Sequence, residues 1–516
     1  MKTKSVLFFV VAIAVILASC NGDYDKQGNA KTYTLNVSRN IPAGGNVIVN
    51  GVTNPAATTR TPGSTITLRA TPNSGYTFVN WTATSGTLPK FTDGSATAAT
   101  VTFSINSNVS IRANFRVNFQ LHELPVLIIN TGGRPIDSRD VWMTGVSYEL
   151  FDEAGALLTQ GETEIRGRGH STWSRDDFPK KPYNLRLGSD KALLGMPSHN
   201  RWALLANYSD KTLLRTEVAF YKLASIFDNI PWTPSARQVD LYLNGEYRGV
   251  YQLTESVRAS DNRVKFNRIR NTNPDGGFLL EICTRLEDEY HFTTARQVWV
   301  NCSSPDSNLD VLINGTSMTI FEKIMSYIQE AENVLYSSDF TDQSTGWQKY
   351  LEMDSFVDFY LINEVAKNND AQFYSSVYMY YDDAIGKLRM GPIWDFDISM
   401  GNINYNSCDR TDGLYIYHAK WLRQLFRDPL FVAAVKARWI EKYDELSTIY
   451  QFIDERAAYL NTAQAANFEK WPTLNQKVWP NRVVTGSYAG EIEELKFWLS
   501  QRINWLDEEL RTLTAW

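Results

Sequence analysis

Residues 368–399 read NNDAQFYSSVYMYYDDAIGKLRMGPIWDFDIS, and this stretch places acidic residues on both sides of a predicted hairpin. Asp370 follows a helical pattern and lies on a polar turn, whereas Asp395 and Asp397 come at the end of the hairpin. Two carboxylates at positions i and i+2 of an extended strand point to the same face, which suits one hard divalent cation. An exposed or capping pair is the alternative. The apolar residues around the two acids favour a buried strand, whose carboxylates need a cation or donors.

A glycine-rich turn precedes this stretch. The sequence RGRGHSTW at 166–173 follows a predicted strand, and the backbone N–H groups of such a turn could surround an anion. The residues expected to contact the anion are Arg166, Gly167, Gly169 and Ser171. About a dozen residues later, Lys180 and Lys181 begin another predicted strand. An ordinary hairpin turn and a solvated strand end are the alternatives for these two features.

The order of these features is the order that phosphoryl transfer needs. Glycines cover phosphates, a lysine neutralises them, one Asp orients the acceptor hydroxyl and another holds Mg²⁺. A helical pattern at 211–227 contains Glu217, and the hairpin predicted at 238–255 ends at Glu255. From this order alone, Glu217 is the hypothetical partner of the lysine, and Glu255 competes for that role.

Six blocks in this order resemble the CotH kinase-like family of atypical kinases. They are RGRGHSTW, KKPYNLRL, LLGMPSHNRWALLANYSDKTLLR, LYLNGEYRGVYQLTE, NNDAQFYSSVYMY and GPIWDFD, which cover roughly residues 120–430. The resemblance implies a divergent, two-lobed protein-kinase-like α+β fold. It also implies that ATP and Mg²⁺ or Mn²⁺ are used to phosphorylate Ser or Thr in a protein substrate.

The family roles carry over to matching positions of this chain. The resemblance makes Asp370 the catalytic acid and Asp395 a metal ligand, with Asp397 beside it. Lys181, or else Lys180, would contact phosphates beneath the 166–173 turn. Two departures matter: Ser375 and Ser376 stand where some members have a metal-binding Asn, and His170 stands where the family usually has Asn. Ser376 is therefore the residue expected at the second metal position.

Residues 33–117 differ from the rest of the chain in composition. They are rich in Thr, Val, Asn, Gly and Ser and alternate with period two, which predicts a small all-β module. The phrases PNSGYTFVNWTAT and SIRANF resemble the divergent InlB-type bacterial repeat, a module of exported proteins.

The N-terminus reads as an export signal. Lys2 and Lys4 precede an apolar stretch that ends in Leu-Ala-Ser-Cys at 17–20, which resembles the bacterial lipobox. We expect residues 1–19 to be removed, Cys20 to be lipidated and to anchor the chain to a membrane, and residues 20–32 to form a polar tether. The protein is accordingly predicted to be an exported lipoprotein of the bacterial cell envelope, on the outer membrane or cell surface. An ordinary signal peptide is the alternative.

Composition limits the function classes. The chain has 516 residues, 51 Lys and Arg against 57 Asp and Glu, and a net charge of −6, so no overall basic field attracts nucleic acid. We expect the kinase-like domain at 118–430 and a helical C-terminal extension at 431–516. The alternatives to a kinase are an inactive kinase-like module that binds protein or carbohydrate, and a metal-dependent glycosyltransferase or glycosidase. Cys283 and Cys302 are expected either to pair or to be buried thiols.

Overall fold

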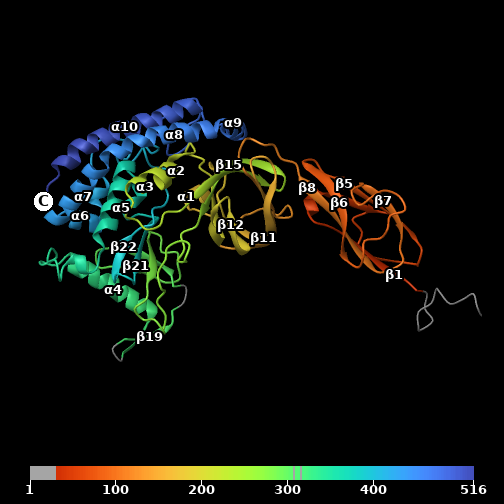
Figure 1. Ribbon diagram of the computed structural model, residues 1–516, viewed down its shortest axis with the longest axis horizontal. Helices are drawn as coiled ribbons and strands as arrows, with labels where there is room; N and C mark the ends of the chain where they lie inside the picture. Colours follow the sequence, from red (N-terminus) through yellow and green to blue (C-terminus); the bar gives the residue numbers. More distant parts are fainter. Residues whose placement is uncertain (1–30, 306–307, 314–315, 516) are drawn as a thin grey trace, which may run out of the picture. The chain divides into compact units, whose positions relative to one another are not determined.

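The computed structural model describes residues 31–305, 308–313 and 316–515, and these form two compact units (Figure 1). The first unit holds residues 31–120 together with the short segments 128–135 and 242–247, and the second holds the remainder. The proposed signal peptide and Cys20 lie outside the described residues.

The first unit contains the predicted all-β module. Two four-stranded sheets, ordered β4-β1-β8-β6 and β3-β2-β5-β7, enclose a core that includes Trp81, Phe103 and Phe115. The strands are β1 (Tyr33–Arg39), β2 (Gly45–Val49), β3 (Val52–Thr53), β4 (Thr58–Arg60), β5 (Thr65–Pro72), β6 (Tyr76–Ser85), β7 (Thr100–Ser104) and β8 (Val109–Val117). The period-two pattern of the sequence thus corresponds to strands with one face buried in this core.

A closed barrel of seven strands follows, in the order β10-β11-β12-β13-β15-β14-β9. Its strands are β9 (Val126–Asn130), β10 (Met143–Phe151), β11 (Leu157–Gly167), β12 (Tyr183–Leu193), β13 (Met196–Leu205), β14 (Ala236–Leu243) and β15 (Glu246–Glu255). The predicted hairpin at 238–255 is confirmed as β14 and β15. Asn244 and Gly245 join them with φ of 53° and 85°, and positive φ at both central residues is what a type I′ turn requires.

The helical pattern at 211–227 forms a shorter, irregular helix than its sequence predicts. It consists of α2 (Arg215–Glu217), a π-helical turn at Val218–Leu223 and α3 (Ala224–Ile226). Asp210 lies before the helix, and its carboxylate accepts hydrogen bonds from the backbone N–H groups of Thr212 and Arg215. The residues between barrel and helix are therefore fixed by local polar contacts.

A five-stranded sheet and two long helices come next. The sheet has the order β17-β18-β16-β21-β22 and is built from β16 (Phe278–Ile282), β17 (His291–Thr293), β18 (Trp299–Ser304), β21 (Val377–Asp382) and β22 (Lys387–Met390). A ribbon of β19 (Asp310–Ile313) and β20 (Thr316–Thr319) leads into α4 (Ile320–Leu335), which begins with a capping box of Thr319 and Glu322. Helix α5 (Met353–Ala366) is buried along nearly its whole length, and its polar residues Asp358, Asn363 and Glu364 are buried together with its apolar ones.

The C-terminal part is helical, as predicted, and belongs to the same compact unit as the five-stranded sheet and most of the barrel. It contains α6 (Lys420–Leu425), α7 (Pro429–Lys442), α8 (Thr448–Tyr459), α9 (Asn461–Lys470) and α10 (Tyr488–Thr512). Figure 1 shows α10 running beside α8. Buried residues of α7 and α10, such as Trp439 and Trp498, share one core with Phe359 of α5. The second unit is thus a mixed α+β body in which the C-terminal helices complete the core.

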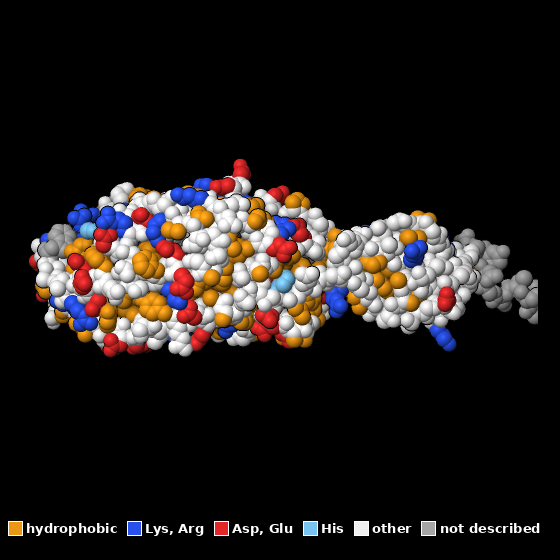
Figure 2. Space-filling model, turned by 90° about the horizontal axis from the view of Figure 1, so that it is seen from above, with side chains coloured by type: hydrophobic (Ala, Val, Ile, Leu, Met, Phe, Trp, Pro, Cys, Tyr) orange, Lys and Arg blue, Asp and Glu red, His pale blue; other side chains and the backbone are white. Residues whose placement is uncertain are grey.

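The surface of the protein has no dominant charge on the face shown in Figure 2. Figure 2 shows acidic and basic side chains interspersed over the face in view. Among the described residues, no helix is long and apolar enough to cross a membrane.

Cys283, Cys302 and Cys408 are buried free thiols, so of the two interpretations of Cys283 and Cys302 the structure supports unpaired thiols.

A buried ion pair joins α5 to α10 and generates a stability prediction. Arg502 Nη2 lies 2.6 Å from Glu364 Oε1, and both side chains are fully buried. Removing one partner leaves an uncompensated charge, so Arg502→Ala should lower the free energy of unfolding by about 3–5 kcal/mol. Arg511→Ala breaks an exposed pair with Asp507 on the same helix and should cost less than about 1 kcal/mol. Urea unfolding followed by tryptophan fluorescence measures both. Equal losses would contradict the assigned role of the buried pair.

Candidate functional site

A pocket of about 400 Å³ lies in the second unit and is lined by half of the predicted site residues of that unit. Its lining combines acidic, basic and aromatic side chains. The acids are Asp370, Asp395 and Asp397, the cations are Arg168, Lys180 and Arg285, and the aromatic residues are Phe178, Tyr208, Tyr374, Tyr405 and Trp479. Segments far apart in the sequence therefore converge on one cavity.

Asp370 is positioned by the end of α5. The helix stops at Ala366, Lys367 adopts a left-handed conformation, and a 3₁₀ turn at Asn369–Ala371 presents Asp370 to the pocket. Asn369 Nδ2 donates to Asp370 Oδ1 at 2.9 Å. The carboxylate thus projects from a buried, hydrogen-bonded turn, which gives it a fixed direction.

Asp395 and Asp397 line the pocket, but the prediction that they lie on a strand is wrong. Strand β22 ends at Met390, and residues 391–396 have no regular secondary structure. Pro392 has no N–H to donate to a sheet, and Asp395 has φ of 67°, so the chain cannot continue as a strand there. Ser376 Oγ donates to Asp395 Oδ2 at 3.1 Å, which places the predicted second-metal residue directly beside the predicted metal-binding acid.

Burial and the nearby carboxylates raise the pKa of Asp370 and of Asp397. The pKa of Asp370 rises to about 6, first because the carboxylate is desolvated and then because Asp395 is close. The pKa of Asp397 is raised well above its ordinary value by burial, and also by Asp395, Asp210 and Asp370. Like charges in a low-dielectric pocket favour a bound cation or proton. A cation bound between these acids would therefore relieve their repulsion.

The donor set fits a magnesium-type ion that is shared with a ligand. Within residues 31–305, 308–313 and 316–515, no three His, Cys, Asp or Glu side chains form a ready-made metal cluster. Mg²⁺ needs no such cluster, because it commonly takes one or two carboxylates and completes its shell with water and phosphate oxygens. Asp395 and Asp397 would be those carboxylates, with the Ser376 hydroxyl beside them.

Of the two adjacent lysines, only Lys180 lines the pocket. Its Nζ donates to the Val250 carbonyl at 2.6 Å and to Asn467 Oδ1 at 2.9 Å, and burial lowers its pKa to about 7. Lys181 Nζ instead donates to the carbonyls of Trp173 and Arg175. The geometry therefore favours Lys180 as the lysine that could contact phosphates, whereas the resemblance put Lys181 first.

The predicted glutamate partners of the lysine are also elsewhere. The Glu217 carboxylate pairs with Arg456 of α8 at 2.9 Å. Glu255 accepts the backbone N–H of Ser235 and lies 3.8 Å from Arg263. Neither contacts a lysine or lines the pocket, so the hypothesis of a Lys–Glu pair at either position is wrong for this structure. The order of motifs in the chain does not indicate that Glu217 pairs with Arg456 of α8.

The glycine-rich turn is divided between the pocket and the barrel. Gly169 and Ser171 line the pocket. Gly167 lies under the Trp173 ring, where a Cβ atom would come within 2.5 Å of the indole, so glycine is required there for packing. Arg166 points to the Trp142 ring rather than to the pocket. Two of the four predicted anion contacts therefore lie at the pocket.

Arg168 is a pocket residue that the sequence analysis missed. Its guanidinium lies 5.2 Å from the centre of the Trp394 ring, and its Nη1 is buried without a hydrogen-bond partner in the described structure. Burial lowers its pKa, while Asp395 and Asp397 oppose that shift. The sequence offered one indication of this position, because Arg168 lies in RGRG, two residues after Arg166. Period two predicts a shared face for these two arginines, but not which of them reaches the pocket.

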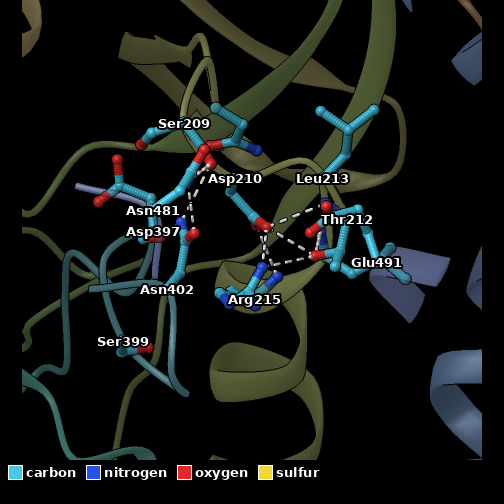
Figure 3. A network of polar contacts seen from close by, with 12 residues as sticks. Ser209, Asp210, Thr212, Leu213, Arg215, Asp397, Ser399, Asn402, Asn481 and Glu491 are labelled. Atoms are coloured by element: carbon cyan, nitrogen blue, oxygen red, sulfur yellow. Dashed lines mark hydrogen bonds and ion pairs between the residues drawn. The ribbon is translucent and has the colours of Figure 1, made fainter. Parts of the chain in front are cut away.

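A polar network fixes the loop behind the acids (Figure 3). Asn402 Nδ2 donates to the Asp397 carbonyl at 2.7 Å and to the Ser209 carbonyl at 3.1 Å. Asn481 Nδ2 donates to the same Ser209 carbonyl and to Asn402 Oδ1. Three segments, including one from the C-terminal part, are thereby held together next to Asp397.

Two family models match parts of the chain. The model of the CotH kinase protein family matches residues 165–506. The chain belongs to this family. The match ends within α10, so it takes in most of the helical part that the sequence analysis treated as an extension. The divergent InlB B-repeat domain matches residues 40–119, as the resemblance implied. No match to a curated protein accompanies these two.

The raised pKa of Asp370 predicts that this residue reduces stability. The folded-state pKa exceeds the unfolded one, so the penalty is present above pH 6 and disappears as the pH falls towards 4. Asp370→Asn should raise the free energy of unfolding at pH 7.5 by about 1–3 kcal/mol, since one pKa unit corresponds to about 1.4 kcal/mol. The gain should be largely lost at pH 4 in urea titrations. Asp275→Asn, at an exposed carboxylate, is the control. A loss of stability at pH 7.5 would contradict the electrostatic account.

Proposed function

We propose that the protein is a protein kinase that transfers the γ-phosphate of ATP to Ser or Thr hydroxyls with the help of Mg²⁺ or Mn²⁺. The observation that supports this most strongly is the convergence of Asp370, Asp395 and Lys180 with the turn at Gly169 and Ser171 on one pocket. Membership in the CotH kinase protein family supports the same conclusion.

Each group has a role in this proposal. Asp370 accepts the hydrogen bond of the acceptor hydroxyl and takes its proton, and a pKa of about 6 suits this use near neutral pH. Lys180, Arg168 and Arg285 face the phosphate oxygens, and the turn lies over them. A divalent ion held by Asp395 and Asp397 would neutralise charge on the phosphates. The bond to the leaving ADP oxygen breaks as the new phosphate ester forms.

The location of the protein is part of the proposal. The signal-like N-terminus and Cys20 support an exported bacterial lipoprotein attached to a membrane of the cell envelope. The InlB-type module would then lie between the lipid anchor and the kinase-like unit. The protein acceptor would be presented at the cell envelope, where this unit can reach it.

Removal of either central acid should abolish phosphate transfer. Asp370→Asn should lower the rate at least about a hundredfold, because a positioned acid or base contributes about 10²–10⁴. Asp395→Asn should also lower the rate strongly, because it removes a proposed ligand of the divalent ion. The measurement is transfer of labelled γ-phosphate from ATP to the full chain or to a Ser/Thr-rich protein, with Mg²⁺ or Mn²⁺. The exposed variant Asp275→Asn should retain activity.

The outcomes of that assay are distinct. Nucleotide binding without turnover in the unaltered protein would contradict the kinase proposal and favour an inactive kinase-like binding module. Absence of nucleotide binding would also refute the nucleotide site.

The adjacent lysines provide a matched test of the pocket. Lys180→Met removes a cation that lines the pocket, whereas Lys181→Met removes one that holds backbone carbonyls at its side. Lys180→Met should weaken binding of ATP about tenfold or more, since a charge-assisted contact contributes roughly 1.5–3 kcal/mol. Calorimetric titration measures both variants, and circular dichroism checks that each is folded. A larger effect at Lys181 would overturn the assignment.

A further inference from the structure

Three arginines surround one tryptophan on the barrel, outside the pocket. The guanidinium carbons of Arg166, Arg186 and Arg201 lie 4.6, 4.9 and 5.0 Å from the centre of the Trp142 ring. They belong to the neighbouring strands β11, β12 and β13, and Arg186 lies directly opposite Arg201. None of these side chains lines the pocket. The proposed phosphoryl transfer therefore gives them no role.

The positive charge of this group is only partly compensated, since Asp140 lies near Arg166 and Asp288 lies near Arg258. Exposed Arg258 is close enough to lower the pKa of both Arg166 and Arg201. Arg186 pairs with Glu164, and Arg166 donates to the Asp140 carbonyl. In the described part of the chain, Arg201 and Arg258 have no acidic side chain at ion-pair distance, and Arg166 Nε is buried without a hydrogen-bond partner. We call these four residues, Arg166, Arg186, Arg201 and Arg258, the arginine cluster.

The arrangement suits a ligand with several separate negative charges. The three guanidinium carbons all lie within 5.0 Å of one ring centre, so they present several positive charges within a small area. Contact with an indole face helps to fix a guanidinium and leaves its N–H edges available for bidentate contact with carboxylates, as at Arg201, whereas Arg186 already pairs with Glu164. A bound polyanion would also remove the repulsion among the four arginines.

One member of the arginine cluster is close in sequence to a residue that lines the pocket. Strand β11 contains Arg166, and Arg168, two residues later, lines the pocket. Two residues of extended chain cover roughly 7 Å. A segment bound at the arginine cluster would therefore place residues a few positions away at the pocket.

We propose that the arginine cluster binds an Asp- and Glu-rich segment of the protein acceptor, next to the Ser or Thr that is phosphorylated. That the acidic segment belongs to a phosphate acceptor rests on the proposed kinase function, whereas binding of the segment itself does not. We infer an acidic peptide because several guanidinium groups lie close together and would match several carboxylates in charge. The arginine cluster would thereby select acceptor sites with acidic neighbours.

Fluorescence anisotropy of the full chain with a labelled decapeptide of Asp and Glu, lacking Ser and Thr, tests the proposal. The peptide should bind, and the double variant R201Q/R258Q should weaken binding about tenfold, with a similar weakening at high salt. R270Q removes an exposed arginine elsewhere in the same unit and should bind as the unaltered protein does. Asp370→Asn should also retain binding, which separates this result from failure of the kinase proposal.

The remaining outcomes overturn the proposal. No binding of the acidic peptide, or equal binding by R201Q/R258Q and the unaltered protein, would refute it. Binding of polyphosphate or of vesicles with anionic lipid through the same arginines, without binding of the peptide, would assign the arginine cluster to a phosphate-bearing ligand instead. A peptide in which Asn and Gln replace the acids controls for contacts with the peptide backbone.

Discussion

Repulsion among the carboxylates of the pocket is the constraint around which the second unit is organised. Asp370, Asp395 and Asp397 share one pocket, although Asp395 raises the pKa of both other acids and Asp370 raises the pKa of Asp397. Such an arrangement persists only if the surrounding chain is held firmly. The Asn402 and Asn481 amides provide this by binding the backbone next to Asp397 and at Ser209. The acids are therefore kept close at a cost to stability that a bound cation would offset.

The C-terminal helices take part in this site instead of merely flanking it. Asn467 of α9 accepts a hydrogen bond from Lys180, Trp479 lines the pocket, and Arg502 of α10 pairs with Glu364 of α5. Helix α5 leads directly into the turn that carries Asp370. Loss of these helices would remove both a partner of the pocket lysine and the support of the acid turn. This accounts for a family match that extends to residue 506.

Local patterns predicted much of the fold and part of the site. Period two located the all-β module and the 238–255 hairpin, and helical patterns located α5 and the C-terminal helices. Asp395 and Asp397 were found because carboxylates in apolar surroundings need a cation, and Asp370 through the resemblance to the CotH kinase-like family. Partners across the fold were not predictable: nothing local to Glu217 indicates Arg456, and nothing in the pair of lysines indicates that Asn467 and the Val250 carbonyl hold Lys180. The positive φ at Asp395 likewise depends on tertiary contacts rather than on strand propensity.

The central claim is that the acids and Lys180 form one site for a metal and a nucleotide. Anomalous diffraction from crystals grown with Mn²⁺ and a non-hydrolysable ATP analogue tests it most directly. The account predicts a manganese peak within about 2–2.5 Å of a carboxylate oxygen of Asp395, with the phosphate chain against Lys180 and beneath Gly169 and Ser171. A metal and nucleotide bound elsewhere, or a pocket that stays empty at saturating ligand, would contradict it.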